Sequence, residues 1–444
     1  MLLGDAVKLA ASMLRGIQGK GIGERAEFYR YLKKHPKVEL QTARFAYLLG
    51  LETIRRLNLV DRVLFEALGT PLNGVSDELL NILRLYVYWF MFKETTLEDH
   101  ARFMQEAAPL LKGWERRNLE ETALKLYNFK WEGLLKKLGD VERISLVKFH
   151  PQWFVEYCFR RFGRRFSLRL MDSNNQLKPS YLRVNTLKVD EEDALESLRR
   201  EGVRLKPVPR VMHLYRLVGS KARLQSSKAY HDGLFTIQDK ASCMAVYALD
   251  PSPREEVLDV CAAPGGKTSL IAQLMENEGR ILSLDSSQNR MKIWRKEMMR
   301  LGVEIAHPIL GDAANPPLKT LVDRLLIDPP CSGTGSFNVF PGMKWRLDLK
   351  VVETYARLQR RILDQCSRLL RVGGIMVYST CSVMVEEGEK VIETFLNQNP
   401  NFELLPAYPG LEAPPLMSHP GPIRLYPHVD GSYGFFIAKL KRVD

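Results

Sequence analysis

Two cysteines stand where their thiols could take part in one reaction. Cys331 lies in segment 328–333 (Asp-Pro-Pro-Cys-Ser-Gly) and Cys381 in segment 379–382 (Ser-Thr-Cys-Ser). Each segment follows an apolar run that predicts a β-strand. Because ligands bind beyond the carboxyl ends of parallel strands, we expect both thiols at one edge of a sheet. A lone cysteine is more often a small buried hydrophobe, which is the role we assign to Cys158, Cys243 and Cys366.

Thiols at such an edge suit a reaction at carbon 5 of cytosine, which is a poor nucleophile. Addition of a thiolate to carbon 6 breaks the conjugation of the ring and makes carbon 5 electron-rich, so that it can take a methyl group from a sulfonium. A base must then remove the carbon-5 proton, and the thiol must be expelled. An acid that hydrogen-bonds N3 of the ring favours the addition, and Asp328 is the candidate.

A glycine loop follows an earlier predicted strand, at residues 257–260. The paired glycines let a ligand approach the backbone, and the next helix begins with an N-terminus that attracts negative charge. A P-loop is excluded, because its first glycine would stand at Cys261, and no GxGxxG fingerprint is present. S-adenosylmethionine, a nucleoside without a polyphosphate, fits this loop better. The candidate cofactor contacts are Cys261, Ala262, Ala263, Pro264, Gly265, Gly266 and Lys267.

Three aspartates stand at the ends of successive predicted strands. Asp259 precedes the glycine loop, Asp285 ends the next strand, and Asp312 follows a third. By the logic of dinucleotide folds, Asp285 is placed to hold ribose hydroxyls. Asp312 is placed to accept the amino group of adenine. The alternative is that these acids only form turns, and three of them in succession make that interpretation weaker.

The alternation of elements along the C-terminal part predicts the fold that positions these residues. Strands at 257–260, 280–285, 325–328 and 374–379 alternate with helices, which indicates a mostly parallel sheet with helices on both faces. Segment 431–440 predicts a late strand, plausibly antiparallel. We therefore expect a Rossmann-like α/β domain at residues 251–444.

The rest of the chain divides into two further regions. Residues 1–140 predict a helical domain, with a buried helix over 79–92 and a capping box of Thr95 and Glu98. Residues 141–250 predict a small α+β module, with a strand at 179–185 and a helix at 190–200. The apolar stretch 79–92 is too short to span a membrane.

Composition favours a polyanionic partner. The net charge is +13 and the pI is near 9.3, which places nucleic acid ahead of a membrane surface. The six cysteines form no CxxC pair and no zinc-type cluster, so we expect no metal site. Reduced thiols, and an N-terminus without the apolar core of a signal peptide, favour a cytoplasmic protein.

Taken together, the motifs resemble those of the RsmB/Sun family of RNA cytosine-5 methyltransferases. The resemblance runs from about residue 150 to the C-terminus. It is carried by the segments 174–175, 182–185, 238–239, 261–268, 328–333, 380–382 and 427–436. It implies a class I methyltransferase domain with S-adenosylmethionine as methyl donor and an RNA substrate, ribosomal before transfer RNA. The helical region resembles the NusB-like domain of such proteins, and the middle module resembles their RNA-binding extension.

The resemblance also implies roles for single residues. Cys381 would be the nucleophile and Cys331 would assist release of the methylated product. Lys267 would lie near the cofactor and the target base. Arg290, with Asp285, Asp312 and Asp328, would match ligand contacts of the family.

The segment 160–169 is strongly basic. Five arginines between residues 160 and 169 are interleaved with phenylalanines, and they either bind phosphates or form a solvated helix face.

One rival function, an amino-group methyltransferase, is disfavoured. In such enzymes the residue after Pro-Pro is usually aromatic, whereas here it is Cys331. A non-catalytic RNA-binding or ribosome-assembly protein would explain the charge but not the clustered motifs.

Overall fold

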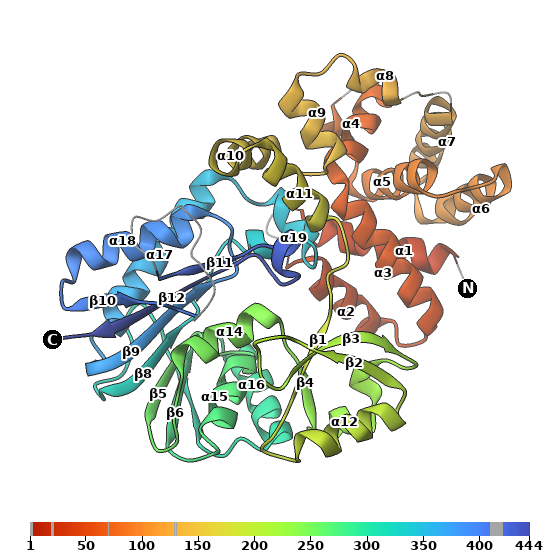
Figure 1. The fold of residues 1–444 in the computed structure, drawn as a ribbon. Coiled ribbons are helices and arrows are strands. Elements are labelled where there is room, and N and C mark those ends of the chain that lie inside the picture. Colours follow the sequence, from red (N-terminus) through yellow and green to blue (C-terminus); the bar gives the residue numbers. More distant parts are fainter. Residues whose placement is uncertain (1–2, 19–21, 70, 128, 130, 409–420) are drawn as a thin grey trace. The chain divides into compact units, whose positions relative to one another are not determined.

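The computed structural model describes residues 3–18, 22–69, 71–127, 129, 131–408 and 421–444 (Figure 1). The chain divides into two compact units. The first comprises Met1–Leu177 and Phe337–Asp348, and the second comprises Lys178–Ser336 and Leu349–Asp444. Within the described residues, none of the helices is both long enough and apolar enough to cross a lipid bilayer.

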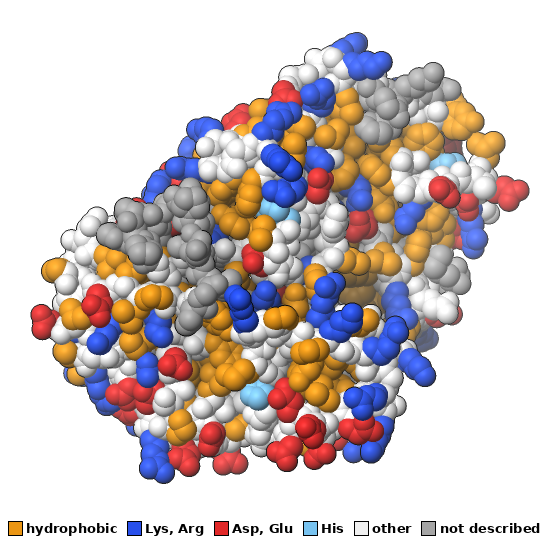
Figure 2. Space-filling view, in the orientation of Figure 1, with side chains coloured by type: hydrophobic (Ala, Val, Ile, Leu, Met, Phe, Trp, Pro, Cys, Tyr) orange, Lys and Arg blue, Asp and Glu red, His pale blue; other side chains and the backbone are white. Residues whose placement is uncertain are grey.

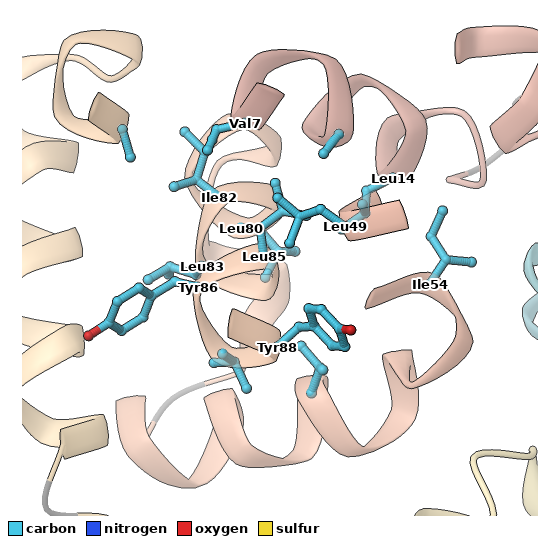
Figure 3. Packing of buried hydrophobic residues seen from close by; sticks show 14 of the residues in the cluster. Val7, Leu14, Leu49, Ile54, Leu80, Ile82, Leu83, Leu85, Tyr86 and Tyr88 are labelled. Carbon is cyan, nitrogen blue, oxygen red and sulfur yellow. The ribbon is translucent and has the colours of Figure 1, made fainter. Parts of the chain in front are cut away.

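The first unit is helical, as predicted for the N-terminal region. Its α-helices are α1 (Leu3–Arg15), α2 (Glu24–Lys34), α3 (Leu40–Arg55), α4 (Leu57–Leu68), α5 (Asp77–Phe92), α6 (Leu97–Ala107), α7 (Gly113–Tyr127), α8 (Trp131–Leu135), α9 (Asp140–Val147), α10 (Gln152–Phe162) and α11 (Arg164–Asn174). Every residue of α5 from Leu79 to Tyr88 is buried, so the prediction of a core helix is confirmed. Figure 3 shows side chains of α5 packed against Val7, Leu14 and Leu49.

One detail of this unit was predicted wrongly. The capping box joins Thr96 to Asp99, one residue later than the predicted pair of Thr95 and Glu98. Both pairs have the required spacing, but the hydroxyl of Thr95 bonds the ring of His100 instead. The hydroxyl of Thr96 is therefore the one that accepts from a backbone amide of the first turn.

The second unit begins with a small four-stranded antiparallel sheet of strand order β2-β3-β1-β4. The strands are β1 (Tyr181–Val184), β2 (Val203–Pro207), β3 (Leu214–Ser220) and β4 (Phe235–Ile237). Helix α12 (Glu191–Arg200) packs Ala194 and Leu198 inward, and the short α13 (Lys228–His231) follows β3. The predicted small α+β module is present. Its boundaries, like those of the other two predicted domains, stay predictions.

The large sheet of the second unit has the strand order β10-β12-β9-β8-β5-β6-β7, with β11 paired to β12. Strands β5 to β9 pair in parallel, and β12 pairs with β9 in the antiparallel sense, as expected. The strands are β5 (Glu256–Val260), β6 (Arg280–Asp285), β7 (Ala306–Leu310), β8 (Val322–Ile327), β9 (Leu370–Thr380), β10 (Phe402–Leu405), β11 (Ile423–Leu425) and β12 (Phe435–Arg442).

Helices cover both faces of this sheet (Figure 1). One buried cluster joins it to α14 (Lys240–Leu249) and α15 (Gly266–Leu274). Another joins it to α17 (Leu349–Ser367) and α18 (Glu389–Gln398), and contains Cys366 as expected. Helix α16 (Gln288–Leu301) lies beside β6 and β7, and the short α19 (Pro427–Asp430) precedes β12. This is the predicted Rossmann-like arrangement.

Candidate active site

The loops after β5, β8 and β9 bring the predicted reactive residues together at one edge of the large sheet. Parallel strands present their carboxyl ends at the same edge, so the segments that follow them become neighbours. The sulfur atoms of Cys331 and Cys381 lie 3.1 Å apart. The predicted proximity of the two thiols is thus present, although they are separated by 49 residues in the chain.

The side chains of Cys331 and Cys381 are both partly exposed. The hydrogen bond with Cys381, followed by burial, raises the pKa of Cys331 well above that of an ordinary thiol. Cys331 therefore stays protonated near neutral pH. It can donate its proton toward the Cys381 sulfur.

Lys267 and Asp328 form an ion pair beside the thiols. The Nζ atom of Lys267 lies 2.6 Å from Oδ2 of Asp328, while the hydroxyl of Ser379 donates to Oδ1. Burial alone would lower the pKa of Lys267, but the neighbouring carboxylates of Asp328 and Asp259 outweigh it and raise the pKa. Lys267 is thus cationic near neutral pH. It also interacts electrostatically with Cys381.

The glycine loop forms the wall of the site next to this ion pair. Gly265 has φ 108°, and a Cβ atom there would lie 2.6 Å from Met298 Cε, so the turn requires glycine. Ala262 and Ala263 are buried, and Cys261 is partly buried and packs against the core beside the sheet. Gly266 opens α15, whose second residue is Lys267.

The three aspartates have different environments. Asp259 is buried; its Oδ2 accepts from the Thr268 hydroxyl at 2.6 Å, and its Oδ1 has no protein partner. Burial raises the pKa of Asp259 to about 7. Asp285 ends β6 and accepts from the backbone amides of Ala263 and Ser287. Asp312 is exposed and accepts from the amide of Ala314, as a turn-forming aspartate does.

Arg290 on α16 contacts Asp285 at the end of strand β6. Its guanidinium lies 3.3 Å from Oδ2 of Asp285 and also donates to the carbonyl of Ala263. The carboxylate of Asp285 is therefore already paired with a cation. The contacts predicted for Asp285, Asp312 and Arg290 with the cofactor stay predictions.

Comparison with known proteins assigns the family. A sequence model described as 16S rRNA methyltransferase RsmB/F matches residues 246–441, and a ferredoxin-like domain of RsmF/B-like proteins matches residues 150–220. A probable ribosomal RNA small subunit methyltransferase B from Synechocystis is 30% identical, covering 99% of both chains. The chain belongs to the RsmB/F methyltransferase family.

Two further similarities cover different shares of the chain. The 25S rRNA (cytosine-C(5))-methyltransferase nop2 of Schizosaccharomyces pombe is 32% identical over 66% of this chain and 51% of its own. The crystal structure of PH0851 has a TM-score of 0.87 and 28% identity, covering 100% of this chain and 99% of that one. The chain is thus a methyltransferase with a fold shared along its whole length.

In this RsmB/F chain, a buried carboxylate that the sequence analysis missed holds both cysteine loops. Glu387 is fully buried; its Oε1 accepts from the amide of Ser332 at 2.8 Å and from Gln359 Nε2 at 2.9 Å. Its Oε2 accepts from the hydroxyls of Ser332 and Ser382, the residues directly after the two cysteines. No sequence motif marks Glu387. Two of its hydrogen-bond partners, Ser332 and Gln359, are distant in the chain, and only Ser382 is close.

A close approach of two glycines completes the support of this RsmB/F site. The amide of Gly335 donates to the carbonyl of Cys381 at 3.1 Å, and the amide of Gly434 donates to the carbonyl of Gly335 at 2.9 Å. A Cβ atom on Gly335 would lie 1.8 Å from the carbonyl oxygen of Gly434. Only glycine fits there, so the segment before β12 can pack directly against both cysteine loops.

The predicted basic segment belongs to the other unit of the chain. The arginines of α10 and α11 belong to the first unit and are exposed: Arg160, Arg161, Arg164, Arg165 and Arg169. Arg164 pairs with Asp140. Among the residues that the structure describes, no group of three or more His, Cys, Asp or Glu side chains is placed to hold a metal ion.

Proposed function

We propose that the protein transfers a methyl group from S-adenosylmethionine to carbon 5 of a cytosine in RNA, through a covalent bond between Cys381 and carbon 6. The observation that carries this proposal is the 3.1 Å separation of the Cys331 and Cys381 sulfurs beside the ion pair of Lys267 and Asp328. The names of the relatives favour a ribosomal RNA, with transfer RNA as the second choice.

The cofactor fits the residues present at the edge of the sheet. The loop at 261–266 offers close backbone approach, Asp285 ends the next strand, and the buried Oδ1 of Asp259 lacks a protein partner. When bound, S-adenosylmethionine supplies an electrophilic methyl group on a sulfonium. We propose that the cofactor is contacted by the loop residues, together with Asp285, Arg290 and Asp312.

The chain's own residues divide the remaining work. The thiolate of Cys381 attacks carbon 6, and the cation of Lys267 interacts electrostatically with Cys381. Asp328 hydrogen-bonds N3 of the ring; N3 takes up a proton from the pair of Lys267 and Asp328 as the thiolate adds, and returns it to that pair when the bond to carbon 6 breaks. After methyl transfer, a base takes the proton from carbon 5, the bond between carbon 6 and Cys381 breaks, and Cys331 assists this release.

The product tests this proposal. The full chain is incubated with S-adenosylmethionine carrying a labelled methyl group and with total RNA from cells, and the modified nucleoside is mapped by mass spectrometry. We expect label in 5-methylcytosine at an unpaired or flipped-out position, because the thiol cannot reach carbon 6 inside a helix. Label in N4-methylcytosine or in methyladenosine would overturn the proposal.

A further inference from the structure

Two segments that carry the family resemblance lie in or beside the small sheet, and the proposed chemistry uses neither of them. Segment 182–185 lies largely on β1, and segment 238–239 follows β4. Arg183 from the first and Gln238 from the second are both buried, and Nε of Arg183 donates to Oε1 of Gln238 at 2.7 Å. The two segments therefore meet at one buried guanidinium.

This guanidinium has no acidic partner. Lys and Arg side chains are numerous on the surface of the molecule (Figure 2), whereas Arg183 is only 1% exposed. No Asp or Glu among the described residues forms an ion pair with it. Arg424, which is also buried in this unit, pairs with Glu389. A buried cation without a carboxylate is costly in free energy, and burial lowers the pKa of Arg183, so packing alone does not account for an arginine there.

Attachment of the small sheet to the rest of the unit does not require this charge. Asn185 donates from Nδ2 to the carbonyls of Gly233 and Leu301, at 2.9 and 2.8 Å. The hydroxyl of Tyr181 donates to the carbonyl of Gly431 at 2.9 Å. Neutral side chains on or next to β1 therefore already hold the small sheet in place.

The other partners of Arg183 lie on α15, the helix that follows the glycine loop. Nη2 donates to the hydroxyl of Ser269 at 2.7 Å, and Nη1 donates to Oε1 of Gln273. Ser269 and Gln273 are four residues apart and share one face of the helix. Gly266 is three residues before Ser269 on that face, and a Cβ atom there would lie 3.6 Å from Nε2 of Gln238. Arg183 and Gln238 thus pack against the start of α15.

The hydroxyl of Ser269 links Arg183 to the cofactor loop. It accepts from Arg183 and donates to the carbonyl of Gly266 at 3.1 Å. Gly266 is the last glycine of the loop, and the next residue, Lys267, is paired with Asp328 at 2.6 Å. The guanidinium therefore orients, through one hydroxyl, the peptide bond that joins the glycine loop to the ion pair.

We infer that Arg183 is a positioning residue for the cofactor: it holds the first turn of α15, and with it the glycine loop, in the geometry that binds S-adenosylmethionine. This inference rests on the proposed function, since it takes S-adenosylmethionine as the cofactor. A planar fork of donors suits this task, because it bonds three side chains at once and in fixed directions. Because it is buried, Arg183 acts through Ser269 and not on RNA.

Removal of one hydroxyl tests this inference with little risk to folding. Ser269→Ala breaks the link between Arg183 and the carbonyl of Gly266, and leaves both glutamine contacts of the guanidinium in place. The control is Ser283→Ala, because this serine on β6 is also buried but its hydroxyl has no hydrogen-bond partner among the described residues. Binding of S-adenosylhomocysteine to the full chain is measured by calorimetry, with a melting curve for each variant.

We expect Ser269→Ala to bind S-adenosylhomocysteine about three- to ten-fold more weakly, because a buried donor and a buried acceptor lose their partner. Ser283→Ala should bind it as the parent protein does. Equal affinities of Ser269→Ala and the parent would overturn the inference. Weaker binding by Ser269→Ala, in a parent protein that forms no 5-methylcytosine, would support the inference and overturn the proposed function.

Steady-state kinetics separate positioning of the cofactor from a merely structural role. Arg183→Met is compared with Arg300→Met, which removes a guanidinium that joins α16 to the carbonyls of Tyr230 and Phe235 in the small module. Both variants should melt at lower temperatures. Only Arg183→Met should raise the KM for S-adenosylmethionine, by about ten-fold, with the KM for RNA unchanged. A rise in the KM for RNA alone, or equal rises in the KM for S-adenosylmethionine in both variants, would contradict the inference.

Discussion

The hydroxyls of Ser332 and Ser382, each the residue after a candidate catalytic cysteine, both donate to the same buried oxygen of Glu387. The loops after β8 and β9 are therefore fixed to one carboxylate as well as to the sheet. This relationship accounts for how two thiols from distant parts of the chain are held 3.1 Å apart.

Glu387→Ala should disturb both loops together. It leaves the buried donors of Ser332, Ser382 and Gln359 without their acceptor, so we expect the free energy of unfolding to fall by roughly 2–4 kcal/mol. We also expect methyl transfer to fall more than cofactor binding. Urea unfolding and turnover at saturating cofactor measure both effects.

The control is Glu353→Gln on the exposed side of α17, which should change neither quantity. If Glu387→Ala kept the stability and turnover of the parent protein, the carboxylate would not be what holds the cysteine loops.

Gly335→Ala should be far more damaging than an ordinary exchange of glycine for alanine. Its Cβ atom would lie 1.8 Å from the backbone oxygen of Gly434, so the segment before β12 must move. We expect a lower melting temperature and a strong loss of methyl transfer. Gly113→Ala is the matched control, because nothing lies within 4 Å of that position. Equal melting temperatures for the two variants would contradict the close packing.

Asp259 should make stability depend on pH. Its pKa is raised to about 7 in the folded protein, against about 3.9 for an unfolded chain. The folded state therefore binds the extra proton between these values, and its contribution to stability, present below pH 4, is lost as the pH rises through 7. The full contribution is up to about 4 kcal/mol.

Asp259→Asn removes this titratable group and tests whether the unfolding free energy falls or rises with pH. Between pH 4 and pH 8, the stability of the parent protein should fall relative to that of the variant. The difference in unfolding free energy is measured by urea at each pH. Asp312→Asn, at an exposed position, should run parallel to the parent. A parent that gains stability relative to Asp259→Asn over this range would contradict the prediction.

The fold of the second unit could be predicted because its signals are local. Strand β6 has the predicted bounds, and β5 and β9 contain the predicted segments, since apolar runs bounded by glycine and aspartate mark them directly. That Cys331 and Cys381 lie at one edge of the sheet followed from their positions after two predicted parallel strands. A βαβ alternation determines both the position of each strand in the chain and the edge of the sheet at which each loop lies.

The contacts that support the site could not be predicted in the same way. Glu387 looks like an ordinary acid in an acidic stretch, and only the folded chain shows it buried against Ser332, 55 residues earlier. The pairing of Arg290 with Asp285 likewise depends on the placement of α16 against β6. Segment 337–348 lies in the sequence of the C-terminal domain but packs in the first unit, where Lys344 is buried against the carbonyl of Phe149.

The central claim is that Cys381 bonds carbon 6 of the target and that Cys331 assists its release. Its most direct measurement uses Cys331→Ala, incubated with S-adenosylmethionine and substrate RNA and run on a denaturing gel. We predict a cofactor-dependent covalent complex whose RNA maps to Cys381 by mass spectrometry and which is absent from the variant that also carries Cys381→Ala. A complex attached to another residue, or a folded Cys331→Ala protein that methylates RNA without forming one, would contradict the account.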